Sequence, residues 1–338
     1  MHTAADTVLV SLVTHNDEPF IERCLESVLG QSVPVSVRVF DSASGDRTVE
    51  LAKRFPVATI ASPENVGYCR GHNANLGGQS SRHALFLNAD CVLDSDFVAR
   101  LVAAVRAGPG IGMAGGKLWR LQADGREGSR PVLDSTGIYF TPAQRHFDRG
   151  AGTEDRGQFD RPEQVFGITG AALLCTREFI EDVRMGDELF DEDFFAYRED
   201  ADLAWRGRLR GWAAVYEPRA RGGHYRRLRA QPRAQVDRLI NFHSVKNRYL
   251  MRTKNLDWAV WRRCFPYMWL RDLGILGYIA LRERDSFGAL REVRRLRPRT
   301  LAKRRHIQSN RRAAPEEIAA WFSFRPVSRP LQQLGTRN

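Results

Sequence analysis

The sequence has few cysteines, and their arrangement argues against two classes of site. They are odd in number, widely spaced and without a CxxC pair: Cys24, Cys69, Cys91, Cys175 and Cys264. Structural zinc sites use closely spaced cysteine pairs, and disulfide frameworks use even numbers of cysteines, so the sequence indicates neither. Unpaired cysteines fit a reducing compartment, and we therefore expect a cytoplasmic protein.

Long hydrophobic runs are also missing. In the apolar C-terminal part, the longest run without a charge is Leu273–Leu281, nine residues, whereas a membrane-spanning helix needs about 20. The apolar run near the N-terminus has the length of a strand and no basic residues before it, so we expect no signal peptide. The sequence predicts a chain that does not cross a membrane.

Acidic residues are scarce in the C-terminal part. Residues 1–202 carry 20 Lys and Arg against 31 Asp and Glu, a net charge of −11, whereas residues 203–338 carry 32 against 9, a net charge of +23. Such asymmetry is typical of attachment to an anionic surface, either phospholipid headgroups or nucleic acid.

Aromatic and basic residues interleave from Asn241 onwards, as they do in amphipathic helices at a membrane interface. We expect this region to bind anionic lipid peripherally, at the cytoplasmic face of the membrane. A helical subdomain that packs on the rest of the protein is the alternative. No nucleic-acid-binding module is visible, so we expect no nucleic acid partner.

What is present is an alternation of strands and helices. Four short β-rich runs are separated by helical stripes, at residues 8–14, 36–40, 57–61 and 84–87. This pattern predicts an α/β fold with a mostly parallel sheet flanked by helices. Residues 120–164 are expected to form loops with a hairpin near 137–140. We expect a catalytic domain over 1–240 and a basic, aromatic-rich helical region over 241–338.

Polar residues end each of these successive elements: Thr14-His15-Asn16, Asp41-Ser42-Ala43-Ser44, Asn65-Val66-Gly67-Tyr68 and Asn88-Ala89-Asp90. Open α/β sheets bind ligands at the carboxyl ends of their strands, so a polar ligand is expected there. We interpret Asp90 as an anchor for a metal ion and a diphosphate. The alternative is that Asn88 and Asp90 only end a strand and cap a helix starting near Asp94.

Three carboxylates crowd the start of a predicted helix, at Glu199, Asp200 and Asp202. The helix dipole favours acidic residues in a first turn, so capping is one explanation. Three carboxylates within four positions exceed what capping requires. They are therefore candidates for a functional role.

The order and spacing of these motifs resemble family 2 glycosyltransferases of the GT-A fold, close to the rhamnosyltransferase-like branch. The resemblance covers about residues 7–255. It is carried by VTHN (13–16), DSASGDRT (41–48), NVGYCRGHN (65–73), FLNAD (86–90), YREDADLAWR (197–206), and Pro218 followed by His224.

The resemblance implies a binding site for a nucleotide-sugar donor. Asp41 would bind the pyrimidine base, and the loop at Thr14, His15 and Asn16 would frame the base and ribose. Four further residues would flank the diphosphate and the sugar: Asn65, Gly67, Arg70 and Asn73.

The resemblance also implies a divalent cation, Mg²⁺ or Mn²⁺, with Asp90 and His224 as ligands. The cation would neutralise charge on the leaving diphosphate. Asn88 stands where the family has its first metal-site aspartate, so we expect Asn88 to contact the donor or a water. Metal affinity should be lower than with two carboxylates, and a metal-independent variant stays open.

For catalysis, the resemblance implies that Asp200 is the general base of an inverting transfer. Glu199 would orient or repel it, Asp202 would contact the acceptor or cap the helix, and residues 167–171 would shape the acceptor side. The expected reaction moves a sugar, rhamnose from dTDP or a sugar from UDP, to a hydroxyl of a lipid-linked or cell-envelope glycan. A nucleotide-sugar-binding protein without turnover is the alternative.

Overall fold

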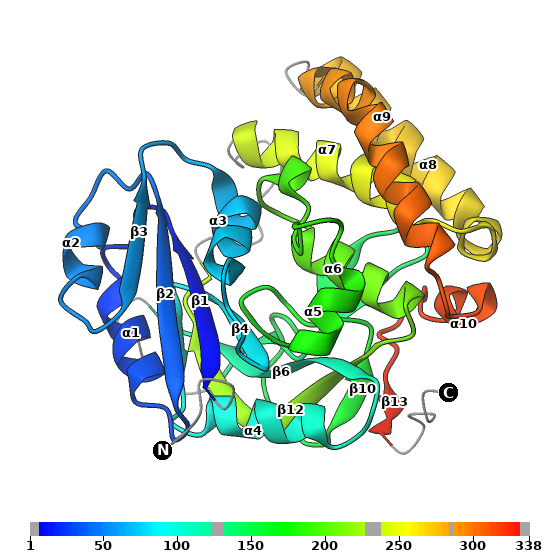
Figure 1. Ribbon diagram of the computed structural model, residues 1–338. Coiled ribbons are helices and arrows are strands. Elements are labelled where there is room, and N and C mark those ends of the chain that lie inside the picture. Colours follow the sequence, from blue (N-terminus) through cyan, green and yellow to red (C-terminus); the bar gives the residue numbers. More distant parts are fainter. Residues whose placement is uncertain (1–6, 123–130, 227–237, 284–286, 332–338) are drawn as a thin grey trace.

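The computed structural model describes residues 7–122, 131–226, 238–283 and 287–331. A mixed sheet forms the centre, with strand order β13-β10-β12-β6-β11-β4-β1-β2-β3 (Figure 1). Helices cover both of its faces, and further helices extend from one side. The predicted α/β fold with a flanked sheet and a helical C-terminal region is confirmed.

The N-terminal part of the sheet is parallel. It consists of β1 (Val8–Thr14), β2 (Val35–Ser42), β3 (Ala58–Ser62) and β4 (His83–Asn88). In register, Thr14 pairs with Asp41 and Val13 with Asn88. The polar strand ends therefore meet at one edge of the sheet, as the sequence predicts.

Strand alternation separates two hydrophobic cores. Val8 and Val10 of β1 belong to one core, and Leu9 belongs to the other, because successive side chains point to opposite faces. The first core lies under α1 (Ile21–Leu29), α2 (Thr48–Ala52) and α4 (Phe97–Arg106), and the second under α3 (Gly67–Leu76).

The second part of the sheet is mixed. β11 (Ala172–Thr176) runs antiparallel between β4 and β6 (Ile111–Arg120), and β6 pairs in parallel with β12 (Ala213–His224). β5 (Cys91–Leu93) pairs with the end of β12, so that Cys91 lies opposite His224. This pairing brings the polar end of β4 beside the end of β12.

The segment between β6 and β11 contains short strands. They are β7 (Leu133–Ser135), β8 (Ile138–Phe140), β9 (His146–Asp148) and β10 (Glu163–Val165). β8 and β9 pair as an antiparallel hairpin, which confirms the hairpin expected near residues 137–140.

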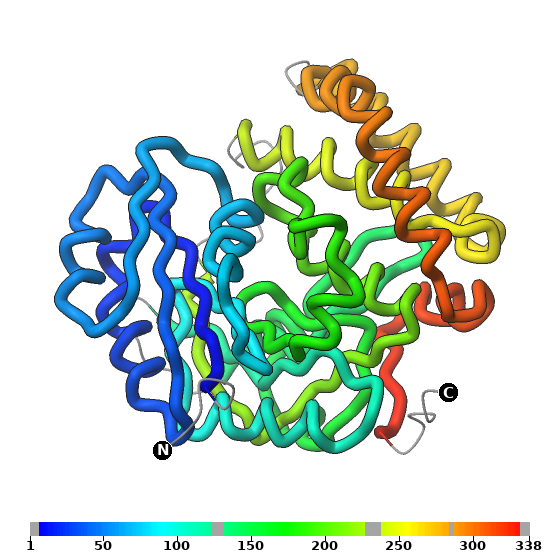
Figure 2. Tube along the Cα trace, viewed as in Figure 1, coloured from blue at the N-terminus to red at the C-terminus, as the bar shows by residue number. Residues whose placement is uncertain are grey.

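Helices dominate the rest of the chain. α5 (Arg177–Val183), the 3₁₀ helix η2 (Glu192–Phe194) and α6 (Glu199–Leu209) come first. After them come α7 (Arg238–Asn255), α8 (Trp258–Arg282), α9 (Phe287–Ser309) and α10 (Pro315–Ala319). The short strand β13 (Arg329–Pro330) returns to the sheet beside β10. In the tube view, the helical region extends outwards beyond α6 (Figure 2). None of the helices in the described ranges is long and apolar enough to cross a membrane.

Buried ion pairs fasten α7 and α9 to the segment before α6. Lys254 of α7 bonds Asp191 and, at 3.0 Å, Asp202. Lys303 of α9 reaches Asp191 at 2.5 Å and Asp193 at 2.9 Å. Because breaking a buried ion pair leaves an uncompensated charge and is strongly destabilising, these contacts hold the helical region against α6.

Candidate active site

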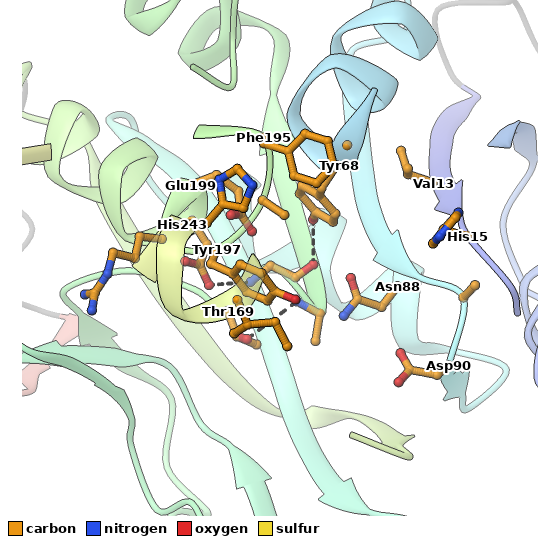
Figure 3. Close-up of a pocket in the computed structure, with 18 of the residues that line it drawn as sticks. Val13, His15, Tyr68, Asn88, Asp90, Thr169, Phe195, Tyr197, Glu199 and His243 are labelled. Carbon is orange, nitrogen blue, oxygen red and sulfur yellow. Dashed lines mark hydrogen bonds between the residues drawn. The ribbon is translucent and has the colours of Figure 1, made fainter. Parts of the chain in front are cut away.

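A pocket of about 750 Å³ opens at the carboxyl edge of the sheet. Residues from β1, β4, α3, α6, α7 and β12 line it, although they lie far apart in the sequence. In Figure 3, Asp90, Asn88 and His15 lie on one side of the pocket, and Glu199, Tyr197 and His243 lie on the other. The predicted donor-side and catalytic motifs thus face one cavity.

On the β1 side, Thr14 and His15 line the pocket, whereas Asp41 is buried and is not among the lining residues. Thr14 Oγ1 donates to Asp41 Oδ1 at 2.8 Å, and the Ser44 backbone N–H donates to Asp41 Oδ2 at 2.9 Å. Asn16 bonds the neighbouring turn, where its Oδ1 accepts from the Gly45 N–H at 2.8 Å. The predicted first loop is therefore tied to the end of β2 by hydrogen bonds.

Of the residues expected to flank the diphosphate, Asn65 and Gly67 line the pocket. Arg70 and Asn73 of α3 instead contact the segment that leads to η2. Arg70 Nε pairs with Glu192 at 3.0 Å, and Asn73 Oδ1 accepts from the Phe190 N–H at 3.0 Å. The structure places these two side chains where they hold that segment.

Asp90 and His224 meet in the pocket, as the sequence predicts for metal ligands. His224 Nε2 lies 3.2 Å from Asp90 Oδ1, and both residues are nearly buried. Asn88 lines the pocket beside them. The alternative that Asp90 caps a helix does not hold, because α4 begins at Phe97 and its N-cap residue is Asp96.

The Asp90–His224 pair fits a divalent cation. Asp90, Cys91 and His224 present ligand atoms within 4.8 Å of one another. Cys91 Sγ, however, donates to the Ala171 carbonyl, and burial raises the pKa of its thiol well above the usual value, so the carboxylate and the imidazole are the suitable ligands.

Asp134 of β7 lies beside the Asp90–His224 pair. The sequence did not predict this residue as part of the site. Its Oδ2 lies 2.7 Å from His224 Nδ1, and its Oδ1 accepts from Arg226 at 2.8 Å. A carboxylate on the far nitrogen fixes the orientation of a ligating imidazole and raises its basicity. Burial lowers the pKa of His224, but hydrogen bonds and charge from Asp134 and Asp90 outweigh burial and raise it to about 10, so a cation that binds Nε2 would displace a proton.

Across the pocket, Glu199 and Asp200 begin α6. The Gly170 N–H donates to Asp200 Oδ2 at 2.9 Å, and the Ala201 N–H donates to Asp200 Oδ1 at 2.7 Å. Tyr68 donates to the Gly170 carbonyl at 2.9 Å, so this part of the predicted acceptor segment 167–171 is fixed from both sides.

Burial raises the pKa of both carboxyl groups, and the charge of Asp200 adds to the increase for Glu199. Glu199 Oε2 is buried and has no hydrogen-bond partner within the described structure. A carboxyl pair with raised pKa values in a pocket has the properties of a general base.

The loop before α6 is strained. Phe195, Tyr197 and Arg198 all have positive φ angles, 68°, 71° and 72°, which is costly for residues other than glycine. Asn247 of α7 holds the loop by donating to the carbonyls of residues 194, 196 and 197. The helical region thus shapes the wall that carries Glu199 and Asp200.

Gly67 lets this loop approach α3. Its φ is +79°, and a Cβ there would lie 2.6 Å from Phe195, too close for any real side chain. On its other face, Phe195 stacks on His243 of α7, with ring centroids 4.8 Å apart.

Asp202 is not brought into the pocket. It is fully buried on the other face of α6, where it pairs with Arg206 at 2.9 Å and Lys254 at 3.0 Å. Asn255 also donates to it at 2.7 Å. The structure therefore separates Asp202 from the two carboxylates that precede it and gives it a place in the ion-pair network.

A sequence model of the family described as Glycosyl transferase family 2 matches residues 10–183, more than half of the chain. The chain belongs to glycosyl transferase family 2. One curated relative is the glycosyltransferase GlyA of Streptococcus pneumoniae, 25% identical over 101 residues. That match covers 28% of this chain and 14% of GlyA, so the chain matches only a small part of this relative.

Solved glycosyltransferases share the fold of this family 2 chain. GalNAc-T7 with UDP, GalNAc and Mn²⁺ has a TM-score of 0.56 at 15% identity, over 73% of this chain and 48% of that chain. The mannosyltransferase PcManGT from Pyrobaculum calidifontis, with GDP-Man and Mn²⁺, has a TM-score of 0.50 at 16% identity. The match covers 93% of this chain and 85% of PcManGT. Staphylococcus aureus TarS residues 1–349 with UDP-GlcNAc has a TM-score of 0.52 at 14% identity. The match covers 93% of this chain and 90% of that chain.

Proposed function

We propose that this protein is an inverting glycosyltransferase that uses a nucleoside-diphosphate-sugar donor. The observation that carries the proposal is that the Asp90–His224 pair and the Glu199–Asp200 pair line one pocket from different sides. An inverting transfer needs charge neutralisation at the leaving diphosphate and a base on the opposite face of the sugar. The two pairs have the chemistry that these two positions require.

Asp90 and His224 would hold the divalent cation, with Asp134 orienting the imidazole. When bound, Mg²⁺ or Mn²⁺ would supply charge neutralisation for the departing diphosphate. Thr14, His15 and Asn65 would contact the nucleotide from the β1 side, above the buried Asp41 carboxylate, and Asn88 would contact the donor or a water. The Mn²⁺ bound to GalNAc-T7 and PcManGT supports this assignment.

Asp200 would accept the proton of the acceptor hydroxyl as that oxygen attacks the anomeric carbon. The Gly170 and Ala201 N–H groups orient its two oxygens, and each oxygen keeps lone pairs for the substrate. Glu199, whose pKa is raised further by the charge of Asp200, would carry a proton and remain neutral beside the ionised base.

The donor and acceptor follow from the sequence resemblance: rhamnose from dTDP, or a sugar from UDP, transferred to a lipid-linked or cell-envelope glycan. Thermal shift against nucleotide sugars, with and without Mn²⁺, tests the donor. A ligand at about 100 times its dissociation constant stabilises the folded protein by about 2.7 kcal/mol. The correct donor should therefore raise the unfolding temperature more than the other nucleotide sugars do. If no nucleotide sugar stabilises the protein with or without the metal, the proposal is wrong.

We further propose that α8 lies on an anionic membrane surface. Nine of the thirteen exposed large hydrophobic residues of the described chain are on this helix: Trp258, Trp261, Phe265, Tyr267, Trp269, Leu270, Leu273, Leu276 and Leu281. The helix carries four arginines, and its single acidic residue, Asp272, is paired with Arg248 and Arg252. Six of these nine recur three or four residues apart between Trp258 and Leu276 and share one side of the helix. An apolar surface with nearby arginines is complementary to anionic lipid.

Flotation with vesicles tests this surface. Wild type should float with phosphatidylglycerol vesicles and less with phosphatidylcholine, and Trp261→Ser combined with Trp269→Ser should reduce flotation at least several-fold. Ile60→Ser is the matched control because Ile60 is 44% exposed on β3, away from α8. Equal flotation of the double variant and wild type would show that α8 does not contact lipid.

A further inference from the structure

Arg198 lines the pocket beside Glu199 and Asp200 and has no carboxylate partner within the described structure. Its Nε donates to the Ser244 carbonyl at 3.2 Å, and Nη2 lies 3.4 Å from Ser244 Oγ. Nη1 lies 3.2 Å from Nδ1 of His146, on β9. Arg198 is thus held between α7 and the β8–β9 hairpin.

None of these three contacts is with a carboxylate, and Asp200 acts on Arg198 only through its charge, without a direct ion pair. Burial and nearby cations lower the pKa of His146 to about 3, so the imidazole is neutral and its Nδ1 can accept a hydrogen bond from Arg198 Nη1. Arg248, Arg271 and Arg145 are the cations that act most strongly on Arg198, and burial together with their charge lowers its pKa to about 9. Arg198 therefore remains a cation at neutral pH, in a locally positive field.

Of the four arginines that are fully buried in the described part of the chain, three have a carboxylate in contact. Arg206 pairs with Asp202, Arg149 with Glu163 and Arg248 with Asp272. Arg226, the other arginine that lines the pocket, is paired with both Asp134 and Asp148. Arg208 has no carboxylate, but it donates to two backbone carbonyls and packs on the Trp321 ring, away from the pocket.

The guanidinium of Arg198 also keeps hydrogen-bonding capacity. It has five N–H donors, and the three contacts use three of them, which leaves one on Nη1 and one on Nη2. A guanidinium with free N–H groups on both Nη atoms can donate to two oxygens of a phosphate or phosphodiester. The charges of Arg248, Arg271 and Arg145 favour an anion at that position, and the single charge of Asp200 opposes them.

We propose that Arg198 forms an anion subsite on the acceptor side of the pocket, which binds a phosphate or phosphodiester group of the acceptor next to the base. This inference rests on the proposed function, because it names the class of acceptor for the transfer. The subsite is distinct from the Asp90–His224 pair, which would serve the diphosphate of the donor.

The test is saturation-transfer NMR with dimethyl phosphate, a phosphodiester anion, on full-length protein saturated with UDP and Mg²⁺. UDP fills the donor site, and its uracil protons report nucleotide binding in the same spectrum. We expect a methyl signal from dimethyl phosphate in wild type, and at least a ten-fold smaller one in Arg198→Gln with an unchanged uracil signal. The neutral analogue trimethyl phosphate should give no signal.

Arg100→Gln is the matched control, because it removes one positive charge from the partly exposed face of α4 and should keep both signals. Arg198→Lys keeps the charge without the paired donors and should bind several-fold more weakly, so the test remains decisive if Arg198→Gln does not fold. An undiminished methyl signal in Arg198→Gln would overturn the proposal. A methyl signal that appears in wild type only when UDP is omitted would assign the anion site to the donor. Loss of the uracil signal in wild type would contradict the proposed function instead.

Discussion

The backbone N–H of Gly170 donates a hydrogen bond to Oδ2 of Asp200 at a distance of 2.9 Å. This contact joins the loop before β11 to the first turn of α6, two segments that are 30 residues apart. It holds the carboxylate in a fixed orientation and partly offsets the burial that raises its pKa. The proposed base is therefore preorganised before substrate binds.

Asp200→Asn should reduce sugar transfer by about 10²- to 10⁴-fold, the usual contribution of a general base. Binding of the nucleotide sugar should be retained, because Asp200 lies across the pocket from Asp90 and Asn88. In wild type, the rate should rise with pH through a value above about 4, the usual carboxyl pKa, since the base must lose its proton. Asp96→Asn, on the exposed N-cap of α4, is the control, and equal transfer by Asp200→Asn and wild type would exclude Asp200 as the base.

Asp134→Asn should weaken Mn²⁺ binding by about 10- to 100-fold, as is typical when a partner of a metal ligand is changed. The variant loses the charge that orients His224 and makes its imidazole more basic. Paramagnetic resonance of free Mn²⁺ during titration measures the affinity directly. Asp148→Asn removes the other carboxylate partner of Arg226 without touching His224 and should bind the metal within about two-fold of wild type. If both variants bind Mn²⁺ as wild type does, Asp134 does not support the metal ligand.

Acid should destabilise the protein through His72. Burial lowers the pKa of His72 to about 3, whereas an unfolded histidine titrates near 6.5. The unfolded chain therefore binds the extra proton first, and this contribution to stability is complete above pH 6.5 and is lost as the pH falls towards 3. Between pH 7 and 5 the loss is about 2 kcal/mol for this one residue, at 1.36 kcal/mol for each pKa unit.

Chemical denaturation at pH 7 and pH 5 measures that loss. His72→Gln cannot titrate, so its stability should fall by about 2 kcal/mol less than that of wild type over this range. His306→Gln, at an exposed position of α9, should behave as wild type does. The same pH dependence in His72→Gln and wild type would show that His72 is not the group responsible.

Gly67→Ala should damage both stability and transfer. The positive φ costs about 1–2 kcal/mol for a residue with a Cβ, and the new methyl group would also displace Phe195 and the loop that carries Glu199. Gly78→Ala is the matched control, because Gly78 also has a positive φ, +68°, but its Cβ would meet nothing within 4 Å. Thermal unfolding and a transfer assay should show a larger loss for Gly67→Ala. Equal losses in the two variants would mean that the contact with Phe195 has no special importance.

Much of the site could be predicted because it depends on local order along the chain. Parallel strands bring their carboxyl ends together, so the residues after β1, β2 and β4 had to meet at one edge. The residue at which a helix begins was harder to predict than the residue at which a strand ends. Residues 71–79 suggest a short helix, but α3 begins at Gly67, where the Asn65 side chain accepts from the Gly67 N–H.

The sequence could not show contacts that depend on long-range packing. Asp134 lies in a segment expected to be mainly loops, and only the pairing of β7 with β6 brings it to His224. Asp202 belongs to the same acidic motif as Asp200, yet the helical turn points it to the opposite side, towards Lys254. The contacts of Asn247 with the strained loop likewise join residues about 50 positions apart.

Lys254 also limits where the chain can be shortened without loss of the site. It neutralises Asp191 and Asp202, which are almost completely buried, so a chain shortened to residues 1–240 would bury two carboxylates without this counter-charge. The same cut would remove Asn247, which holds the loop in front of Glu199. The smallest piece able to carry a working site therefore extends through α7. Insertions or fusions should be placed in exposed segments away from the interface between α6 and α7.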